Sequence, residues 1–486
     1  MAGIQPASGD ECEEDAVGLP AVMEVLMKWF DGKRRESGEC LLAAGILAAA
    51  FAWFHFSSVW ASSDTLYFLN ELSRVSVSEL LWSRFENVTS RVVLEAILFF
   101  FLKHSPVWFY VCNTAVVILT VFMLGFYGRE MGKRCFRMEE APPFFWLLTV
   151  FLFFCYPFGD MTVAGVPGSF INYVWSGTFG MAALLPLCLL LMNRGEGVYS
   201  KKLWLLSALC VIPAANMEQP AALLFFFLPA GAVYLFRKGV KSRGILVLWG
   251  LTICSMAFLL SQGNAVRVEM SAQAYWPEFT ELNLMQKLWN GVASTMNYLL
   301  CIPNMIFLSF AVLLALLALS SPQKSVLWRL SGLIPLFWEG VILAAKAAGK
   351  LLGRDLLRWF NGVEDLSLGT ELSPLGAGLP LFLQALVLGS AVLFLWQYLD
   401  TVFWKISIIG LLGIGFASRV LMGFSPTLFE SHMRTFYYMY LTILAAELCL
   451  AAGLGKCSAK YYRFYWVFIA LLGNANFVRV VLKIAG

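Results

Sequence analysis

The sequence predicts an all-α, polytopic integral membrane protein with about 12–13 transmembrane helices. Hydrophobic residues make up 59% of the 486 residues and charged residues only 14%, whereas soluble globular proteins carry about 25% charged residues. The mean hydropathy is +0.73, and long apolar runs recur from Cys40 almost to the C-terminus. We therefore expect an N-terminal tail, residues 1–39, followed by one transmembrane domain, residues 40–486.

Each apolar run of about 20 residues is a candidate helix, because that length crosses the hydrocarbon core. The candidate spans are 41–60, 106–127, 142–157, 169–192, 202–214, 219–236, 244–262, 293–319, 376–398, 404–422, 435–454 and 462–483. Segments 142–157 and 202–214 are short for a span and would have to tilt or extend. Segment 332–348 is a thirteenth candidate, and its alternative is an amphipathic helix on the membrane surface.

Lys and Arg residues alternate between loops, which orients the bundle. Basic residues gather in the loops 129–137, 194–202, 237–243 and 456–463. Because cytoplasmic loops carry the excess of Lys and Arg, these loops and the N-terminal tail are expected in the cytoplasm. The extracytoplasmic loops are then 61–105, 158–168, 214–218, 263–292 and 423–433. The sequence thus predicts a multi-pass plasma-membrane protein.

Whether the number of membrane crossings is odd or even decides on which side of the membrane the C-terminus lies. Loops 263–292 and 423–433 lie on the same side only if an even number of spans separates them. The confident spans between them number three, so segment 332–348 supplies the fourth and the C-terminus is expected outside.

The first extracytoplasmic loop is long and carries a helical pattern in its second half. Five apolar residues fall on one face of 91–103, namely Leu94, Ile97, Leu98, Phe101 and Leu102. This periodicity predicts a helix that lies along the membrane surface.

Cysteine and histidine usage excludes several classes of site. The eleven cysteines are scattered singly without a CxxC pair, and the three histidines are far apart. This distribution predicts neither a disulfide framework nor a metal site. The net charge of +4 resides in short membrane loops, so no nucleic-acid partner is expected.

Polar residues beside the outer ends of the spans are the candidate functional residues. Polar groups near the bilayer are costly and tend to mark function. Five outer loops each contribute a small cluster: Asp64 and Arg91; Asn172, Tyr173 and Trp175; Glu218 and Gln219; Asn264 and Arg267; Ser425, Pro426 and Arg434. Since these loops meet at one end of a bundle, we expect them to share a site.

Each cluster also has a purely structural interpretation. Asp64 could cap the following helix. Arg91 could pair with Glu95 four residues later. The outer aromatic residues could be interfacial anchors, and Arg267 and Arg434 could contact lipid headgroups nonspecifically.

Taken together, the clusters resemble an uncharacterised family of bacterial polytopic membrane proteins related to the GT-C glycosyltransferases, which use polyprenyl-phosphate sugars. The resemblance covers residues 41–455. Its segments are Asp64, Ser90-Arg91, Gly168-Ser169 with Asn172-Tyr173 and Trp175, Glu218-Gln219, Gly263-Asn264 with Arg267, and Ser425-Pro426-Thr427 with Arg434-Thr435. It implies a GT-C-like bundle with a long first extracytoplasmic loop.

The chain departs from the family pattern at two positions. Ser63-Asp64 stands where the family has two acidic residues, and Ser90 replaces a glycine before Arg91. A lone carboxylate makes a divalent metal doubtful, because hard cations take several oxygen ligands. No cofactor is therefore expected, while one carboxylate suffices for a general base.

The resemblance implies inverting transfer of a sugar from a polyprenyl-phosphate donor to a cell-surface glycopolymer or glycolipid. Its expected partners are the lipid-linked sugar, a glycan or lipid acceptor, and membrane lipids. Asp64 would be the catalytic base, and Arg267, Arg434 and Arg91 would bind the donor phosphate. The expected substrate-binding residues are Asn172, Tyr173, Trp175, Glu218, Gln219 and Asn264.

Two other functions remain open at this point. A lipid or sugar transporter, or a flippase, predicts charges near mid-membrane and an inverted repeat with broken helices. The predicted spans hold few such charges, chiefly Glu339, Lys346 and Glu447, and show no repeat. A non-enzymatic subunit of a cell-envelope assembly complex is the other alternative, because the second acid is missing.

Overall fold

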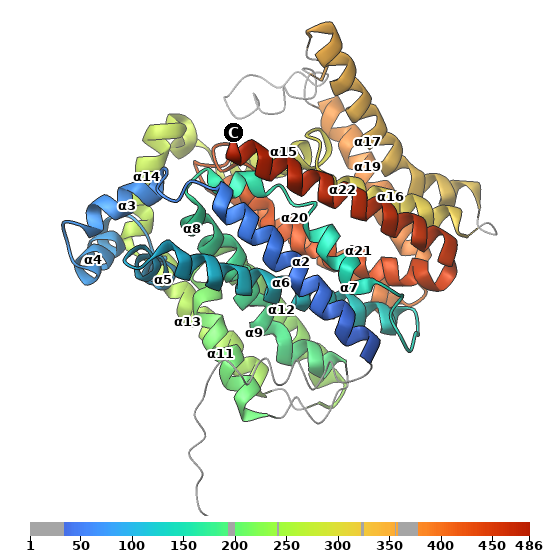
Figure 1. Cartoon of the computed structure of the whole chain (residues 1–486), viewed down its shortest axis with the longest axis horizontal. Coiled ribbons are helices and arrows are strands. Elements are labelled where there is room, and N and C mark those ends of the chain that lie inside the picture. Colours follow the sequence, from blue (N-terminus) through green and yellow to red (C-terminus); the bar gives the residue numbers. More distant parts are fainter. Residues whose placement is uncertain (1–33, 193–199, 241–242, 322–324, 355, 358–377) are drawn as a thin grey trace, which may run out of the picture.

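The structure is a computed structural model that describes residues 34–192, 200–240, 243–321, 325–354, 356–357 and 378–486. Across these ranges the chain forms helices and turns but no strand, so the predicted all-α class is confirmed (Figure 1). Most of the predicted cytoplasmic tail lies outside the described residues.

The multi-pass architecture is confirmed by helices that are long and apolar enough to span a bilayer. The part of the chain that is described contains ten: α2 (Arg34–Ser57), α6 (Pro106–Cys135), α8 to α9 (Val166–Leu191), α12 (Glu218–Arg237), α13 with η3 (Arg243–Leu260), α17 (Val326–Leu352), α19 (Leu379–Tyr398), α20 with η7 (Val402–Phe424), η8 with α21 (His432–Cys457) and α22 (Ala459–Ala485). A bent pair adds an eleventh candidate.

This number is lower than the predicted 12–13 because three apolar segments are short or broken. Helix α7 (Phe145–Phe153) has 9 residues, about 14 Å of helix, and α11 (Lys201–Ala215) has 15, about 23 Å. Neither covers the roughly 30 Å core alone. Segment 293–319 is divided between α15 (Leu284–Leu300) and α16 (Met305–Leu319), which meet at 71°.

Segment 332–348 lies within one long helix, α17, that packs between α16 and α19 (Figure 1). At the end of the chain, Asn476 of α22 donates from Nδ2 to the carbonyls of Phe154 and Tyr156, at 2.9 and 3.2 Å. These carbonyls directly precede loop 158–168. The C-terminal end of α22 therefore lies at the same end of the bundle as that loop, as the thirteen-span topology predicts.

The first outer segment forms three helices, α3 (Asp64–Leu72), α4 (Val77–Asn87) and α5 (Val92–Leu102). Helix α5 occupies the predicted region 91–103. Its apolar face is buried against the rest of the protein: Leu94, Leu98, Phe101 and Leu102 are each at most 6% exposed. The helix thus forms part of the core.

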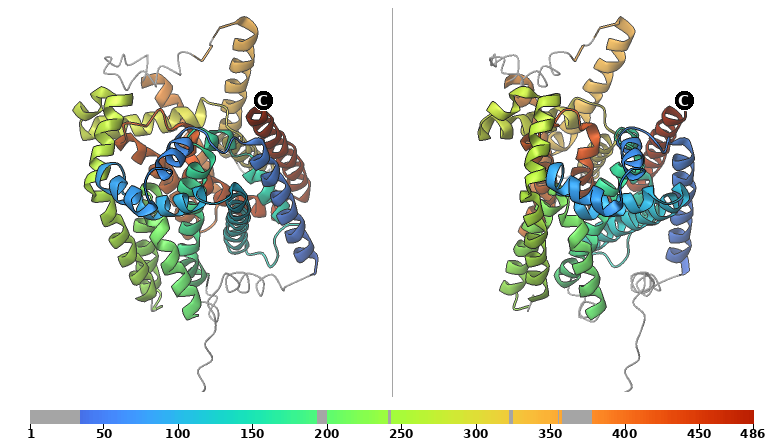
Figure 2. Two further views of the ribbon diagram at one scale, coloured as in Figure 1. Left: turned by 60° about the vertical axis from the view of Figure 1, so that its left-hand side comes forward. Right: turned by 90° about the vertical axis from the view of Figure 1, so that its left-hand side faces the viewer.

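Several short elements gather at the same end as α3, α4 and α5 (Figure 2). They are η1 (Phe158–Thr162), α8 (Val166–Ser169), the π-helical η2 (Phe170–Trp175), α14 (Gln262–Tyr275), η4 (Pro277–Glu281), η7 (Leu421–Phe424) and η8 (His432–Phe436), and η2 continues into the spanning helix α9 (Ser176–Leu191). Helix α21 (Tyr437–Cys457), which follows η8, is the most buried span. Through α21, the buried core of the bundle therefore extends to the end where these short elements lie.

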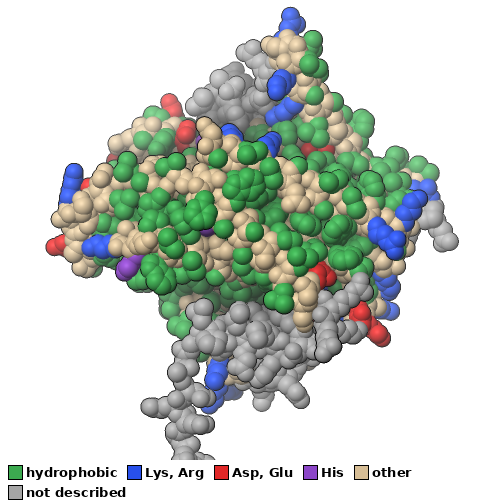
Figure 3. All heavy atoms as spheres, viewed as in Figure 1, with side chains coloured by type: hydrophobic (Ala, Val, Ile, Leu, Met, Phe, Trp, Pro, Cys, Tyr) green, Lys and Arg blue, Asp and Glu red, His purple; other side chains and the backbone are tan. Residues whose placement is uncertain are grey.

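Two of the basic loops, those after α6 and after α21, lie at the opposite end of the bundle. Lys456 donates from Nζ to the carbonyl of Phe136 at 2.6 Å, which joins the loops after α21 and α6. Hydrophobic side chains cover the middle of the visible face, and Lys and Arg side chains lie toward its edges (Figure 3). This distribution is typical of a bilayer-spanning surface.

Candidate functional site

A polar cavity of about 160 Å³ opens at the end of the bundle where the short elements gather. Six of the ten predicted site residues line it: Asp64, Arg91, Asn172, Tyr173, Arg267 and Arg434. They come from α3, the start of α5, η2, α14 and η8. Sites for drug-sized ligands have about 300–1,000 Å³, so this cavity suits only a small polar group.

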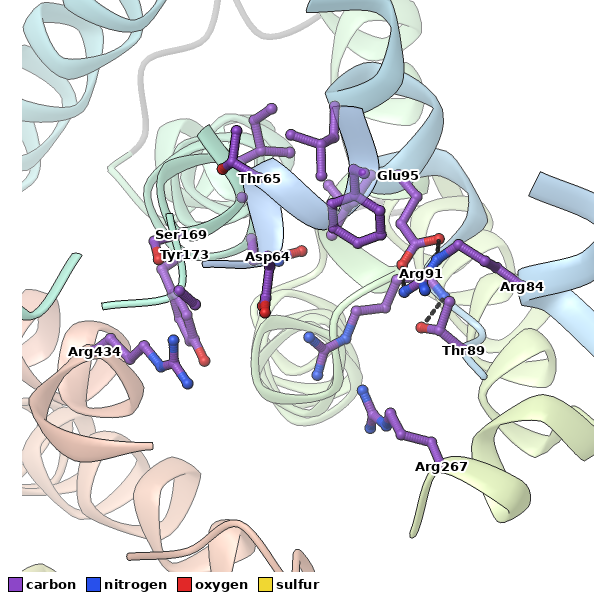
Figure 4. Close-up of a pocket in the computed structure, with 17 residues that line it drawn as sticks. Asp64, Thr65, Arg84, Thr89, Arg91, Glu95, Ser169, Tyr173, Arg267 and Arg434 are labelled. Atoms are coloured by element: carbon purple, nitrogen blue, oxygen red, sulfur yellow. Dashed lines mark hydrogen bonds and ion pairs between the residues drawn. The ribbon is translucent and has the colours of Figure 1, made fainter. Parts of the chain in front are cut away.

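Asp64 is the first residue of α3, and its side chain is exposed to the cavity. The residue at the cap position is Ser63, and no side chain makes a capping bond there. Asp64 carries no hydrogen bond or ion pair to any other described residue. Figure 4 shows its carboxylate between Arg434 on one side and Arg91 with Arg267 on the other. The carboxylate is therefore available for chemistry.

A glycine allows the loop before α8 to approach α3. Gly165 has φ +84°, a conformation that L side chains rarely adopt, and a Cβ there would lie 2.1 Å from Thr65 Oγ1. The absence of a side chain at Gly165 lets the start of α3 pack beside α8. Asp64 is thereby brought next to the second outer loop.

Glu218, the first residue of α12, joins two of the predicted phosphate-binding arginines. Its carboxylate accepts from Arg91 Nη2 at 2.8 and 3.0 Å and from Arg267 Nη2 at 2.9 Å. The three side chains are 19–33% exposed. In this structure the Glu218 carboxylate thus contacts two guanidinium groups.

The helical pair Arg91–Glu95 considered from the sequence does not form. Glu95 instead accepts from Arg84 of α4, with N–O distances of 2.6 and 2.7 Å. The Arg84 guanidinium also lies 4.7 Å from the ring centre of Phe68. This pair braces α4 against α5 and leaves Arg91 to face the cavity.

The two bridged arginines together retain a positive charge. Burial lowers the pKa of Arg267 and Arg91 lowers it further, although Glu218 opposes both effects. Burial would also lower the pKa of Arg91, but Glu218 outweighs it and raises that pKa. Two guanidinium groups share one carboxylate, so an anion entering the cavity meets a net positive charge.

Arg434 lies across the cavity on η8 and has no hydrogen bond or ion pair in the described part of the chain; its Nε is buried without a partner. A fully buried arginine that sequence reasoning missed, Arg419 of α20, supports this element. Its guanidinium lies 4.4 Å from the Phe436 ring centre and donates to the Leu428 carbonyl at 3.3 Å. A charged residue inside the predicted span 404–422 could have identified Arg419 from the sequence.

The second outer loop reaches the cavity through a π-helical turn, a feature frequent at functional sites. Asn172 and Tyr173 line the cavity, and the Asn172 carbonyl accepts from Tyr438 Oη at 2.9 Å. Trp175, predicted to stack on a sugar, is buried elsewhere and donates from Nε1 to Asn113 Oδ1 at 2.8 Å. In this structure Trp175 joins η2 to α6.

Two other predicted substrate-binding residues bond the backbone. Gln219 donates from Nε2 to the carbonyls of Ser418 and Thr435, at 2.9 and 3.0 Å, and so links α12 to α20 and η8. Asn264 donates to the Leu259 carbonyl at 3.1 Å. Neither residue lines the cavity, and both hold in place elements that carry its charged residues.

Asp160 of η1 is a second carboxylate near Arg434 that was not among the predicted site residues. Burial raises its pKa, while the positive charges of His432, Lys483 and Arg434 act to lower it. It is the sole acidic residue in loop 158–168. An acidic residue alone in an outer loop could have marked Asp160 as a candidate site residue from the sequence.

Gly263 is the first residue of the segment that carries Asn264 and Arg267, and replacing it tests how α14 packs on α4. A Cβ at Gly263 would lie 2.3 Å from the Phe85 carbonyl oxygen, so only glycine lets α14 pack this closely on α4. Gly263→Ala should lower stability by about 1–3 kcal/mol, measured as a lower Tm of the purified protein. Gly250→Ala, where nothing lies within 4 Å, is the control. Equal Tm values for the two variants would contradict this contact.

The described residues contain no group of three or more His, Cys, Asp or Glu side chains that could hold a metal ion. Comparisons of the chain with protein-family models, curated proteins and solved structures find no match.

Proposed function

We propose that this protein is a membrane glycosyltransferase that transfers a sugar from a polyprenyl-phosphate donor to a glycan or lipid acceptor of the cell surface. One observation carries the proposal: the unpaired Asp64 carboxylate faces Arg91, Arg267 and Arg434 across one polar cavity. The cavity would thereby combine a general base, Asp64, with three arginines that bind an anion. The resemblance of the same residues to GT-C-related proteins supports the same reaction.

The proposed reaction is an inverting displacement. Asp64 takes the proton from an acceptor hydroxyl as its oxygen forms a bond to the anomeric carbon. The bond from that carbon to the phosphate oxygen breaks, and the polyprenyl phosphate leaves with the electron pair. Arginine suits this leaving group because its planar guanidinium donates two parallel hydrogen bonds to phosphate oxygens.

The size of the cavity is consistent with a lipid-linked donor. A volume of about 160 Å³ accommodates polar groups but not a prenyl chain, which would remain in the bilayer. Exposed apolar side chains lie on elements beside the cavity, including Leu66 of α3 and Leu260 at the end of η3, 48% and 89% exposed. These side chains would give the prenyl chain of the donor an apolar surface between the cavity and the bilayer.

The proposed orientation places the cavity on the extracytoplasmic side of the plasma membrane and the N-terminal tail in the cytoplasm. The basic loops after α6 and α21 lie at the opposite end from the cavity. The positive-inside rule assigns that end to the cytoplasm.

Binding of the donor's charged group tests the proposal. We expect native mass spectrometry of the full chain in detergent to show saturable binding of polyprenyl phosphate. Polyprenol of equal length should bind about 10–150-fold more weakly, because it lacks charge-assisted contacts worth about 1.5–3 kcal/mol. Equal affinity for the two lipids would contradict an anion site in the cavity.

A further inference from the structure

A second polar cluster lies inside the bundle, where α15 breaks before α16. Helix α15 ends at Leu300, and the chain turns through 71° before α16 begins at Met305. Pro303 lies in the break; it lacks an N–H and disfavours helix at the residue before it. The carbonyls at the end of α15 therefore lose the partners that a continuous helix would supply.

Three helices bring polar side chains to this break. Gln384 of α19 donates from Nε2 to Cys301 Sγ at 3.1 Å. Trp338 of α17 donates from Nε1 to the Leu300 carbonyl at 2.8 Å, and the next residue, Glu339, is close enough to Cys301 to interact with it electrostatically. Asn297 lies one turn before Cys301 on the same face of α15.

The side chains of this cluster are almost fully buried: Glu339 is 1% exposed, and Asn297 and Gln384 are 0% exposed. Within the described ranges, both carboxylate oxygens of Glu339, Gln384 Oε1, and Asn297 Oδ1 and Nδ2 have no hydrogen-bond partner. Acceptors thus clearly outnumber donors. Unpaired polar groups inside a membrane protein cost several kcal/mol each, so a ligand that contacts several of these oxygens would stabilise the cluster.

We propose that this cluster binds a monovalent metal cation such as Na⁺ or K⁺. A single positive charge balances the one carboxylate, and a metal cation contacts several oxygens at once, whereas a proton on Glu339 would supply only one donor. The C-terminal end of α15 adds a partial negative charge. Lys346 also interacts with Glu339 electrostatically, but it is exposed and lies about two turns further along α17.

This site is independent of the proposed sugar transfer, because it shares no residue with the cavity that contains Asp64. Ion sites formed where helices are interrupted also use helix C-termini; here the carbonyls of Leu299 and Leu300 already accept from Asn304 Nδ2 and Trp338 Nε1, so the side-chain oxygens would be the ligands. The cation would stabilise the junction of α15, α17 and α19.

The test is thermal unfolding of the purified full chain at constant pH and ionic strength, with NaCl or KCl replacing choline chloride. We expect a saturable rise in Tm of about 2–5 °C at 100 times the Kd. Glu339→Gln keeps the shape but removes the charge and should abolish the rise. Glu447→Gln is the control, because this second buried carboxyl accepts from Tyr465 Oη on another pair of helices and should keep the rise.

A second variant guards against misfolding of Glu339→Gln. Gln384→Leu removes one ligand oxygen and should shift the midpoint of the salt titration at least about tenfold. Identical Tm values in sodium, potassium and choline would overturn the proposal. A Tm that follows pH but not the cation would do the same and assign the site to a proton.

Discussion

Asp64→Asn should lower sugar transfer by about 10²–10⁴-fold, the usual contribution of a positioned general base. Asparagine keeps the size of the side chain but removes the basic oxygen. Because Asp64 carries no partner among the described residues and no side chain caps α3 there, folding and donor binding should remain nearly unchanged. Asp64→Glu should also be poor, since an extra methylene displaces the oxygens by about an ångström.

The measurement is the rate of modification of the cell-surface glycan in cells that carry each variant at equal protein level. Asp400→Asn is the control, because Asp400 is an exposed aspartate in the turn between α19 and α20, next to Tyr398, which contacts Cys457 at the opposite end. Normal glycan modification with Asp64→Asn would remove the catalytic assignment. A non-enzymatic subunit or a transporter would then be the better interpretation.

Arg434→Ala and Arg267→Ala should each weaken binding of polyprenyl phosphate by about 10–150-fold, because each removes a charge-assisted contact worth about 1.5–3 kcal/mol. Arg434→Ala is the simpler test, since its guanidinium has no hydrogen bond or ion pair among the described residues. Arg267→Ala also removes one of the two partners of Glu218. Arg→Lys should restore part of the affinity, because an ammonium lacks the planar fork.

Arg74→Ala is the matched control for the arginine variants. Arg74 follows α3 at the same end of the bundle, its side chain is 73% exposed, and its one ion pair with a described residue is with Glu71. Its removal should leave the affinity for polyprenyl phosphate unchanged. If the Arg267 and Arg434 variants bind the lipid as well as the parent does, these arginines merely contact headgroups.

Hydropathy predicted the fold class and the apolar segments but not the short and broken helices within them. The apolar windows 142–157 and 293–319 satisfy composition, yet the chain bends within or beside both. A sliding average does not detect such breaks, which depend on single residues such as Pro303 and on packing. Segment 332–348 was harder to assign because Glu339 lowers its hydropathy, although this carboxylate is buried within the bundle.

The sequence predicted that polar residues from several outer loops meet at one end, but not which of them line the cavity or how they pair. Alternating loop charge placed the first, second, fourth and fifth outer loops together, and the cavity contains residues from all four. The bridge between Arg91 and Glu218 joins positions 127 residues apart, which no local pattern specifies. Residue type alone likewise assigned Trp175 and Gln219 to substrate, whereas tertiary contacts pair them with Asn113 and with backbone carbonyls.

The most direct test of the proposed function is a structure of the full chain in lipid nanodiscs saturated with polyprenyl phosphate. We expect the phosphate to lie within hydrogen-bond distance of at least two of Arg91, Arg267 and Arg434, with Asp64 facing it across the cavity and the prenyl chain leading into the bilayer. A lipid phosphate bound elsewhere, with this cavity empty at saturation, would contradict it.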